Sequence, residues 1–213
     1  IHMIQTGDLN PHFFNYPSLA IYIDTLSLYA GYQVGSWIGA YEGVSDLAPI
    51  RTAGYGRGRV DTPELLLLGR ATTALFGTLT LLLLALLSRA LVRARWMALV
   101  PVLILALNRD HVRLSHYMTV DVIATFFATA CVVSCTLYLA RRDRRYLWAA
   151  AVCGGLSTAT KYNYVVLAIP VGLSPLLDPR LWLSGQLKQV MACGLIFTLS
   201  FLLATPYVLL DFE

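Results

Sequence analysis

Leu79-Thr80-Leu81-Leu82-Leu83-Leu84-Ala85-Leu86-Leu87 indicates the fold class of this chain. It lies inside a longer apolar run, residues 63–91, whose central part (71–88) contains no charged side chain. A helix needs roughly 20 apolar residues to cross the hydrocarbon core of a bilayer. The run exceeds that length, and it therefore predicts a transmembrane helix.

The composition of the whole chain points to the same class of protein. Of the 213 residues, 57% are hydrophobic and 13% are charged, whereas a soluble domain carries roughly 25% charged residues. The basic residues are dispersed along the chain, so we expect no nucleic-acid partner. All four cysteines lie in apolar runs, which is typical of buried hydrophobic residues and not of disulfides or metal ligands.

Five further apolar runs follow the one at residues 63–91, and three of them are shorter than a full transmembrane span. We therefore predict an all-α, polytopic integral membrane protein with about six transmembrane helices, at residues 63–91, 96–108, 119–140, 146–160, 163–177 and 187–210. We treat residues 1–213 as a single membrane domain. Within it, residues 1–62 form an extracytoplasmic loop, and residues 63–213 hold the transmembrane helices.

The basic residues orient these helices. They gather in three connections: Arg89, Arg93 and Arg95; Arg141, Arg142, Arg144 and Arg145; Arg180 and Lys188. Cytoplasmic loops carry an excess of Lys and Arg, so these three connections are predicted to be cytoplasmic. The intervening connections, around residues 109–119 and around Lys161, then lie on the extracytoplasmic face.

The segment 17–41 does not fit this alternation, because both of its ends would be extracytoplasmic. Its polar residues Asp24, Ser27 and Gln33, with several Tyr and Trp, suit a juxtamembrane helix lying along the interface. A re-entrant helix is the alternative. In the loop after it, Gly54-Tyr55-Gly56-Arg57-Gly58-Arg59 is typical of a solvated flexible segment, with phosphate binding as the other interpretation.

Ionisable side chains gather on the predicted outer face, where they are costly and need a functional reason. Several arginines and a lysine converging there could bind a lipid phosphate. Two residues have simpler explanations: Asp121 could only cap a helix, and Lys161 could only extend towards the headgroups. The outer-face set is Arg70, Arg109, Asp110, His111, Arg113, His116, Asp121 and Lys161.

Four motifs resemble those of bacterial glycosyltransferases that use polyprenol-phosphate sugars. The first is Asn10-Pro11-His12-Phe13-Phe14-Asn15-Tyr16-Pro17-Ser18-Leu19, and the second is Ser115-His116-Tyr117-Met118-Thr119-Val120-Asp121. The third is Gly155-Leu156-Ser157-Thr158-Ala159-Thr160-Lys161-Tyr162-Asn163, and the fourth is Thr205-Pro206-Tyr207 followed by Asp211. These enzymes have the GT-C fold, family 39 or Rgt-like, and are similar to protein O-mannosyltransferases and aminoarabinose transferases.

The resemblance implies an enzyme of the hexosyl- or mannosyltransferase type. Such an enzyme moves a sugar from a polyprenyl- or dolichyl-phosphate carrier to a protein, lipid or glycan acceptor. Its site would lie on the extracytoplasmic face of a bacterial or archaeal plasma membrane. The catalytic base of the family is an aspartate, often in an Asp-Glu pair, which we expect upstream of Ile1. The chain is thus expected to be a fragment that lacks this pair and the C-terminal part, and to be inactive by itself.

The resemblance also suggests roles for residues of this chain. Related enzymes have Lys-Pro-Pro-Leu where this chain has Tyr16-Pro17-Ser18-Leu19, so another cation must hold the phosphate. We expect the carrier phosphate to contact Arg70, Arg109, Arg113 and Lys161. We expect His116 and Asp121 to support these cations, and His12, Asn15, Tyr16 and Tyr162 to line the sugar or acceptor pocket.

Cofactors and competing functions are less constrained. A divalent metal is possible, but no ligand set is visible, because His111 and His116 are five residues apart and do not share a helix face.

The alternative functions are a non-catalytic transporter or lipid-binding membrane protein, or another lipid-phosphate enzyme such as a phosphatase or ligase. A transporter predicts an inverted repeat or paired broken helices, and neither is visible. An upstream Asp-Glu pair would favour the glycosyltransferase.

Overall fold

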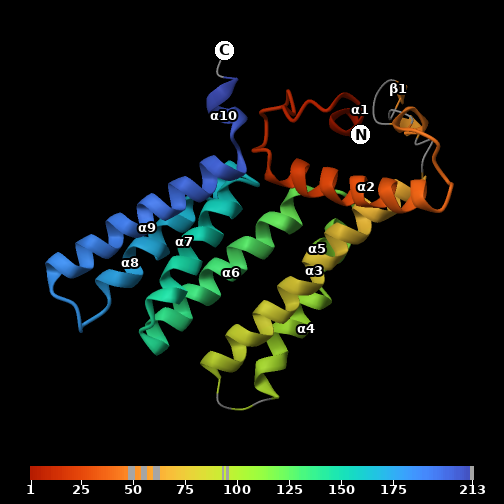
Figure 1. Cartoon of the computed structure of the whole chain (residues 1–213). Helices are drawn as coiled ribbons and strands as arrows, with labels where there is room; N and C mark the ends of the chain where they lie inside the picture. The colour runs from red at the N-terminus through yellow and green to blue at the C-terminus, as the bar shows by residue number, and fades with distance from the viewer. Residues whose placement is uncertain (48–50, 54–56, 60–62, 93, 95, 212–213) are drawn as a thin grey trace.

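The computed structural model describes residues 1–47, 51–53, 57–59, 63–92, 94 and 96–211. The chain is mostly helical, with one two-stranded hairpin (Figure 1). In order, the elements are α1 His2–Thr6, α2 Leu19–Trp37, η1 Val44–Asp46, β1 Arg51–Ala53, β2 Arg57–Arg59, α3 Pro63–Leu91, η2 Met97–Leu99, α4 Val100–Ala106, α5 Arg109–Ser115, α6 Val120–Arg141, α7 Arg144–Thr158, η3 Tyr162–Leu167, α8 Ala168–Leu176, α9 Leu183–Ala204 and α10 Tyr207–Leu210.

The predicted all-α class is confirmed, and each predicted span contains a helix. Three helices, α3, α6 and α9, have the length and apolar composition needed to cross a membrane. The segments Met97–Ala106 and Tyr162–Leu176 are shorter apolar helices, and α7 has 15 residues with two arginines at its start. The structure thus supports a membrane protein with three candidate spans, and the number six remains a prediction.

The helices pack around a core formed mainly by α6, α7, α8 and α9. Its largest fully buried side chain is Tyr138 on α6, which lies in a cluster with Leu147, Cys193 and Phe197. The four cysteines are free, as the sequence predicts. Ser157 on α7 donates a hydrogen bond of 2.9 Å to the carbonyl of Ala124 on α6. A buried hydroxyl that is satisfied across a helix pair in this way fixes the register of α6 and α7.

The connections divide between two ends of the bundle (Figure 1). The α3–η2, α6–α7 and α8–α9 connections lie together at one end, which we call the basic end because Arg89, Arg142 and Arg180 belong to it. Arg93 and Arg95 fall outside the described residues. The other end carries α1, α2 and α10, and both chain termini (Figure 1). This division agrees with the alternation predicted from the arginines.

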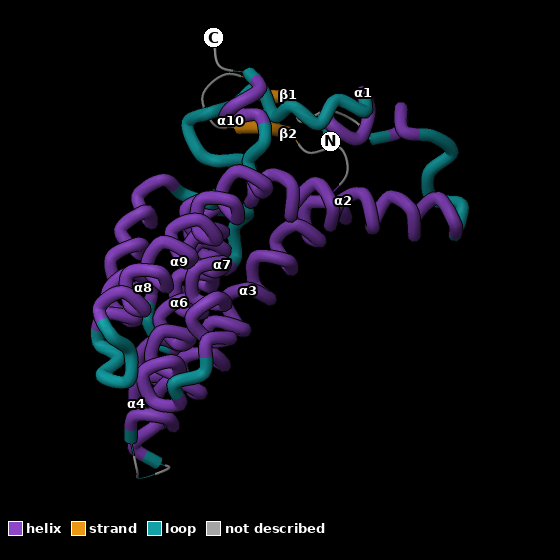
Figure 2. Tube along the Cα trace, turned by 60° about the vertical axis from the view of Figure 1, so that its left-hand side comes forward, coloured by secondary structure: helices purple, strands orange, loops and turns teal. Residues whose placement is uncertain are grey.

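Helix α2 lies across the end of the bundle instead of running alongside α3 and α6 (Figures 1 and 2). Its start is fixed by a hydrogen bond from the Leu19 amide to the Ala159 carbonyl (3.1 Å). Farther along, a Cβ on Gly31 would meet Leu68 at 2.5 Å, so α2 and α3 touch closely there. This placement is what an interfacial helix requires. The end that α2 covers is called the α2 end below.

The loop after α2 contains a short antiparallel ladder. β1 pairs with β2, Arg51 opposite Arg59 and Ala53 opposite Arg57. The glycine-rich segment was expected to be a flexible loop, but its second half belongs to this hairpin. Residues 54–56, which include Gly54 and Gly56, lie outside the described residues.

Candidate functional site

The centre of the candidate site is an ion pair between two of the predicted residues. Nζ of Lys161 lies 2.6 Å from Oδ1 of Asp121, and both side chains are partly exposed. The hydrogen bond with Asp121 raises the pKa of the Lys161 ammonium above its ordinary value. Lys161 is therefore a fixed positive charge throughout the neutral pH range.

The helix ends explain why these two residues meet. Lys161 has an extended backbone (φ −152°) between the end of α7 and the start of η3, while Asp121 lies in the first turn of α6. Because α6 and α7 are adjacent and antiparallel, the start of one lies beside the end of the other (Figure 1). The Asp121 carboxylate is thus engaged by Lys161, and capping is not its only role.

The N-terminal motif lies against the end of the chain. The Asn10 side-chain amide donates to Oδ2 of Asp211 (2.7 Å), and Nδ1 of His12 is 3.9 Å from the same oxygen. Nε2 of His12 is 2.9 Å from Oδ2 of Asp8. His12 itself has a positive φ of 48°, an uncommon conformation for a residue other than glycine. These contacts hold the loop folded over the bundle.

The same loop also reaches the ion pair. Pro17 and Ser18 are fully buried, and the next residue, Leu19, bonds to Ala159, two positions before Lys161. Tyr16 lies close enough to Lys161 to contribute to the raised pKa of its ammonium. The 10–19, 155–163 and 205–211 motifs therefore meet at the α2 end, together with Asp121 from the 115–121 motif.

The other predicted cations do not join this cluster. Arg113 pairs with Asp110 on its own helix (3.0 Å), with both side chains well exposed. Arg70 lies over the ring of Tyr117, with its guanidinium carbon 6.0 Å from the ring centre. Arg109 is exposed. Among the described residues, no ion pair or hydrogen bond connects these arginines to Lys161.

The path of α5 explains the separation. A Cβ on Gly69 of α3 would meet Met118, whereas one on Gly77 would meet Ser115. These two glycines are eight residues apart, which corresponds to about 12 Å along a helix. Followed from Met118 towards the N-terminus, the chain therefore lies along α3 in the direction of the basic end. This places Arg113 of α5 away from Lys161.

The remaining predicted side chains make local contacts or are exposed. His116 ends α5, with Nδ1 2.6 Å from the carbonyl oxygen of Val112. Asn15 is exposed in the N-terminal loop. Tyr162 follows Lys161 and packs beside Phe201 of α9, with ring centres 6.5 Å apart.

Three residues without a predicted role organise the N-terminal loop: Asp8, Asn10 and Asp211. Two of them had a signal in the sequence, because Asn10 opens the first motif and Asp211 closes the fourth. Hydrogen bonds from the backbone N–H of Asn10 and with the His12 side chain lower the pKa of the Asp8 carboxyl. Asp8 is therefore ionised at neutral pH and holds His12 in place.

Three buried polar atoms in the described part of the chain have no hydrogen-bond partner: Oγ of Ser18, Oδ1 of Asp24 and Oγ1 of Thr119. All three belong to the region where α2 meets the bundle, since Ser18 and Thr119 are the N-cap residues of α2 and α6. Orphaned polar atoms are rare in native structures and often mark functional sites. Two of the three, Ser18 and Asp24, belong to the first turns of α2 and its cap.

Asp24 gives a pH-dependent prediction. Burial raises the pKa of its carboxyl to about 6, above an ordinary value near 3.9. The folded state then binds more protons than the unfolded state between about pH 4 and 6, so stability falls as the pH rises through that range. We expect Asp24→Asn to raise the free energy of unfolding at pH 7.5 by about 1–2 kcal/mol, after a discount for solvent screening.

Thermal unfolding in detergent at pH 7.5 and pH 4 measures this effect. The Asp24→Asn advantage should be present at pH 7.5 and disappear at pH 4. Asp8→Asn is the matched control, because the pKa of Asp8 is lowered and its loss should not raise Tm at pH 7.5. The interpretation would be contradicted if the difference in Tm between Asp24→Asn and wild type were the same at both pH values.

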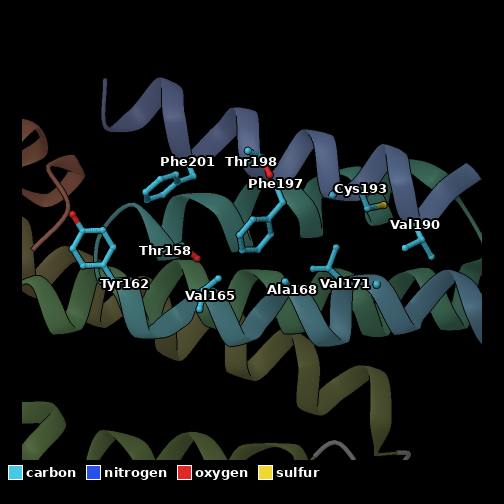
Figure 3. A pocket seen from close by; sticks show the side chains of 12 residues that line it. Thr158, Tyr162, Val165, Ala168, Val171, Val190, Cys193, Phe197, Thr198 and Phe201 are labelled. Carbon is cyan, nitrogen blue, oxygen red and sulfur yellow. The ribbon is translucent and has the colours of Figure 1, made fainter. Parts of the chain in front are cut away.

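An apolar groove of about 530 Å³ is lined by Tyr162, the residue after Lys161 (Figure 3). It lies between the η3–α8 segment and α9, with α7 behind it, and Tyr162 and Phe201 stand at one end of it (Figure 3). Val190 lies at the other end. An apolar groove that leads from a cation is suited to a lipid phosphate with a long hydrocarbon chain.

Metal binding receives no support from the part of the chain that the structure describes. No group of three or more His, Cys, Asp or Glu side chains lies together there in a way that could hold an ion. A divalent metal therefore remains only a possibility raised by the sequence.

Comparison with known proteins settles the family. The family model described as dolichyl-phosphate-mannose-protein mannosyltransferase matches residues 60–212. The chain belongs to this family. Membership in the mannosyltransferase family implies a glycosyltransferase and agrees with the apolar helices of a membrane protein. No curated protein and no solved structure matches the chain.

Proposed function

We propose that the chain forms the donor-binding part of a mannosyltransferase-type site. The enzyme would transfer a hexose from a polyprenyl- or dolichyl-phosphate donor to a protein, lipid or glycan acceptor. The observation that carries this proposal is the Lys161–Asp121 ion pair (2.6 Å), whose lysine directly precedes Tyr162, a lining residue of an apolar groove. A fixed cation beside a lipid-sized groove matches an anion attached to a hydrocarbon chain.

Lys161 is the residue that would contact the donor phosphate. Its ammonium has three donors, of which Asp121 takes one, and its side chain is partly exposed, so a ligand can reach it. Asp121 would act as a positioning residue that aims the ammonium. Arg70 could assist from beside Tyr117, whereas Arg113 is paired with Asp110 on another helix.

The hydrocarbon chain of the donor would lie in the groove. Tyr162 and Phe201 form its end near Lys161, and the lining beyond them is almost entirely apolar (Figure 3). A polyprenyl chain placed there would be shielded from water while its phosphate stays at the α2 end. The N-terminal loop with His12, Asn15 and Tyr16 would then cover the sugar.

The chemistry follows from this placement. An acceptor oxygen attacks the anomeric carbon of the donor sugar with inversion, the carbon–oxygen bond to the phosphate breaks, and that electron pair remains on the phosphate oxygen. Lys161 stabilises the negative charge that develops there. The acceptor hydroxyl gives up its proton to a base, a role that we assign to none of the described residues.

The proposed site lies at the α2 end, opposite the basic end. If the basic end is cytoplasmic, the site faces the extracytoplasmic side. Transfer there would use a donor whose sugar has already crossed the membrane.

Donor binding tests the proposal directly. We expect Lys161→Gln in the full-length protein to weaken binding of a polyprenyl phosphate about tenfold, since it removes one charge-assisted contact. Calorimetric titration in detergent measures this affinity. Lys188→Gln is the matched control, because Lys188 is exposed and lies at the basic end of α9.

A second ligand separates the two parts of the site. The uncharged polyprenol should bind wild type and Lys161→Gln with equal affinity, because it uses only the groove. Unchanged affinity of Lys161→Gln for the polyprenyl phosphate would rule out Lys161 as the phosphate contact.

A further inference from the structure

The basic end contains a buried carboxylate that the proposed function does not use. Asp178 follows α8 and is 1% exposed. Its two oxygens accept hydrogen bonds from Nε (3.1 Å) and Nη2 (3.0 Å) of Arg180, and Oδ2 also accepts from the Tyr138 hydroxyl (3.0 Å). The hydrogen bonds from Arg180 hold the pKa of the Asp178 carboxyl well below its usual range. Asp178 is thus a permanent anion that fixes the guanidinium of Arg180.

A second arginine is tied into the same network. Arg142 ends α6 in the left-handed conformation (φ 59°), and its Nη1 donates to the Leu177 carbonyl (3.1 Å) and lies 3.8 Å from Oδ1 of Asp178. Nη2 of Arg180 donates back to the Arg142 carbonyl (2.8 Å). The α6–α7 and α8–α9 connections are therefore held together with both guanidinium groups in fixed positions.

These groups surround a cavity of about 260 Å³. It is lined by Tyr138, Arg142, Arg144, Asp178, Arg180, Leu181 and Gln189. Three guanidinium groups face one carboxylate, so the lining carries an excess of positive charge. Arg144 is exposed and has no ion pair among the described residues. A guanidinium can donate two parallel hydrogen bonds to two oxygens of one anion, and phosphate offers such a pair of oxygens.

The surroundings of the cavity indicate what carries the anion. The cavity lies beside the C-terminal end of α6 and the N-terminal end of α9, two helices long and apolar enough to cross a membrane. Beside it, Trp182 is 88% exposed and Leu183 is 66% exposed, and a second hollow joins these two residues to Arg180. Exposed tryptophan and leucine at a membrane boundary contact lipid. The ligand should therefore have both a phosphate and hydrocarbon chains.

We propose that this cavity binds the phosphate of an anionic phospholipid from the leaflet at the basic end. Arg142, Arg144 and Arg180 contact the phosphate, and the acyl chains lie against Trp182 and Leu183. Basic pockets between helices at a membrane face recognise anionic headgroups in this way. The site is separate from the donor site, which lies at the α2 end.

The test is lipid binding by the full-length protein, measured by native mass spectrometry during titration with phosphatidylglycerol. Arg144→Gln is the informative variant, because Arg144 lines the cavity without holding Asp178 or Arg180 in place. We expect its affinity for phosphatidylglycerol to fall about fivefold, as for the loss of one basic residue near a membrane surface. Arg89→Gln is the control, with the same loss of charge at the same end.

The possible outcomes separate the explanations. Selective loss in Arg144→Gln, with Arg89→Gln unchanged and phosphatidylcholine binding weak, supports the proposal. Equal loss in both variants would show only a general effect of charge and overturn it. Displacement of the bound lipid by millimolar inorganic phosphate would also overturn it, because the cavity would then be a site for a soluble anion.

Discussion

Gly155→Leu should lower the free energy of unfolding by about 3 kcal/mol, at the upper end of the usual cost of overpacking a core. The reason is a backbone contact between two helices. A Cβ on Gly155 of α7 would lie 2.4 Å from the carbonyl oxygen of Phe197 and 2.8 Å from Cβ of Ser200, both on α9. The first neighbour is backbone and cannot rotate away, so α9 must move as a whole.

Gly194 on α9 provides a matched comparison. A Cβ there meets nothing within 4 Å, so Gly194→Ala should be neutral or stabilising by about 0.5–1 kcal/mol through helix propensity alone. Gly155→Ala gains the same helix propensity, but the close contact of its Cβ with the Phe197 carbonyl oxygen should still lower the free energy of unfolding. Chemical unfolding in detergent micelles, followed by tryptophan fluorescence, measures both. A Gly155→Leu protein as stable as wild type would show that α7 and α9 are not packed as described.

The helices were the most predictable part of the fold. The run 63–91 coincides with α3, and the run 119–140 differs from α6 by one residue at each end. Both rest on local composition and length, which a sequence shows directly. The expected helix at 17–41 exists as α2 at Leu19–Trp37. Its position along the membrane face follows from the arginine-rich connections, which predict that both of its ends lie on the extracytoplasmic side.

The site was less predictable because its contacts join residues far apart in the chain. Lys161 and Asp121 were both candidates, but each also had a local explanation, and only the packing of α6 against α7 makes them a pair. The contact between Asn10 and Asp211 spans almost the whole chain. Neither residue had been given a role.

Arg113 occupies a position that the order of the connections does not predict. It was grouped with Lys161 because both lie in connections predicted to face the same side. That reasoning fixes a side of the membrane but not a position within it. The packing of Ser115 against Gly77 takes α5 along α3, and Arg113 pairs locally with Asp110.

Lys161→Ala should have the largest effect on activity. If Lys161 stabilises the departing phosphate, removing it should lower kcat/KM for sugar transfer about 100-fold or more, as when one donor to a developing oxyanion is lost. Lys161→Arg should retain part of the activity, because the positive charge remains while the geometry of the contact with Asp121 changes. The effect should appear in kcat as well as KM, since the charge on the phosphate grows as the bond breaks.

The measurement that tests the central claim most directly is the initial rate of transfer from a radiolabelled polyprenyl-phosphate sugar by the full-length protein. Wild type, Lys161→Ala and Lys188→Ala are compared at equal amounts of folded protein. We expect a loss of about 100-fold for Lys161→Ala and a near-normal rate for Lys188→Ala, the only other lysine in the chain. A normal rate for Lys161→Ala would contradict the role proposed for Lys161.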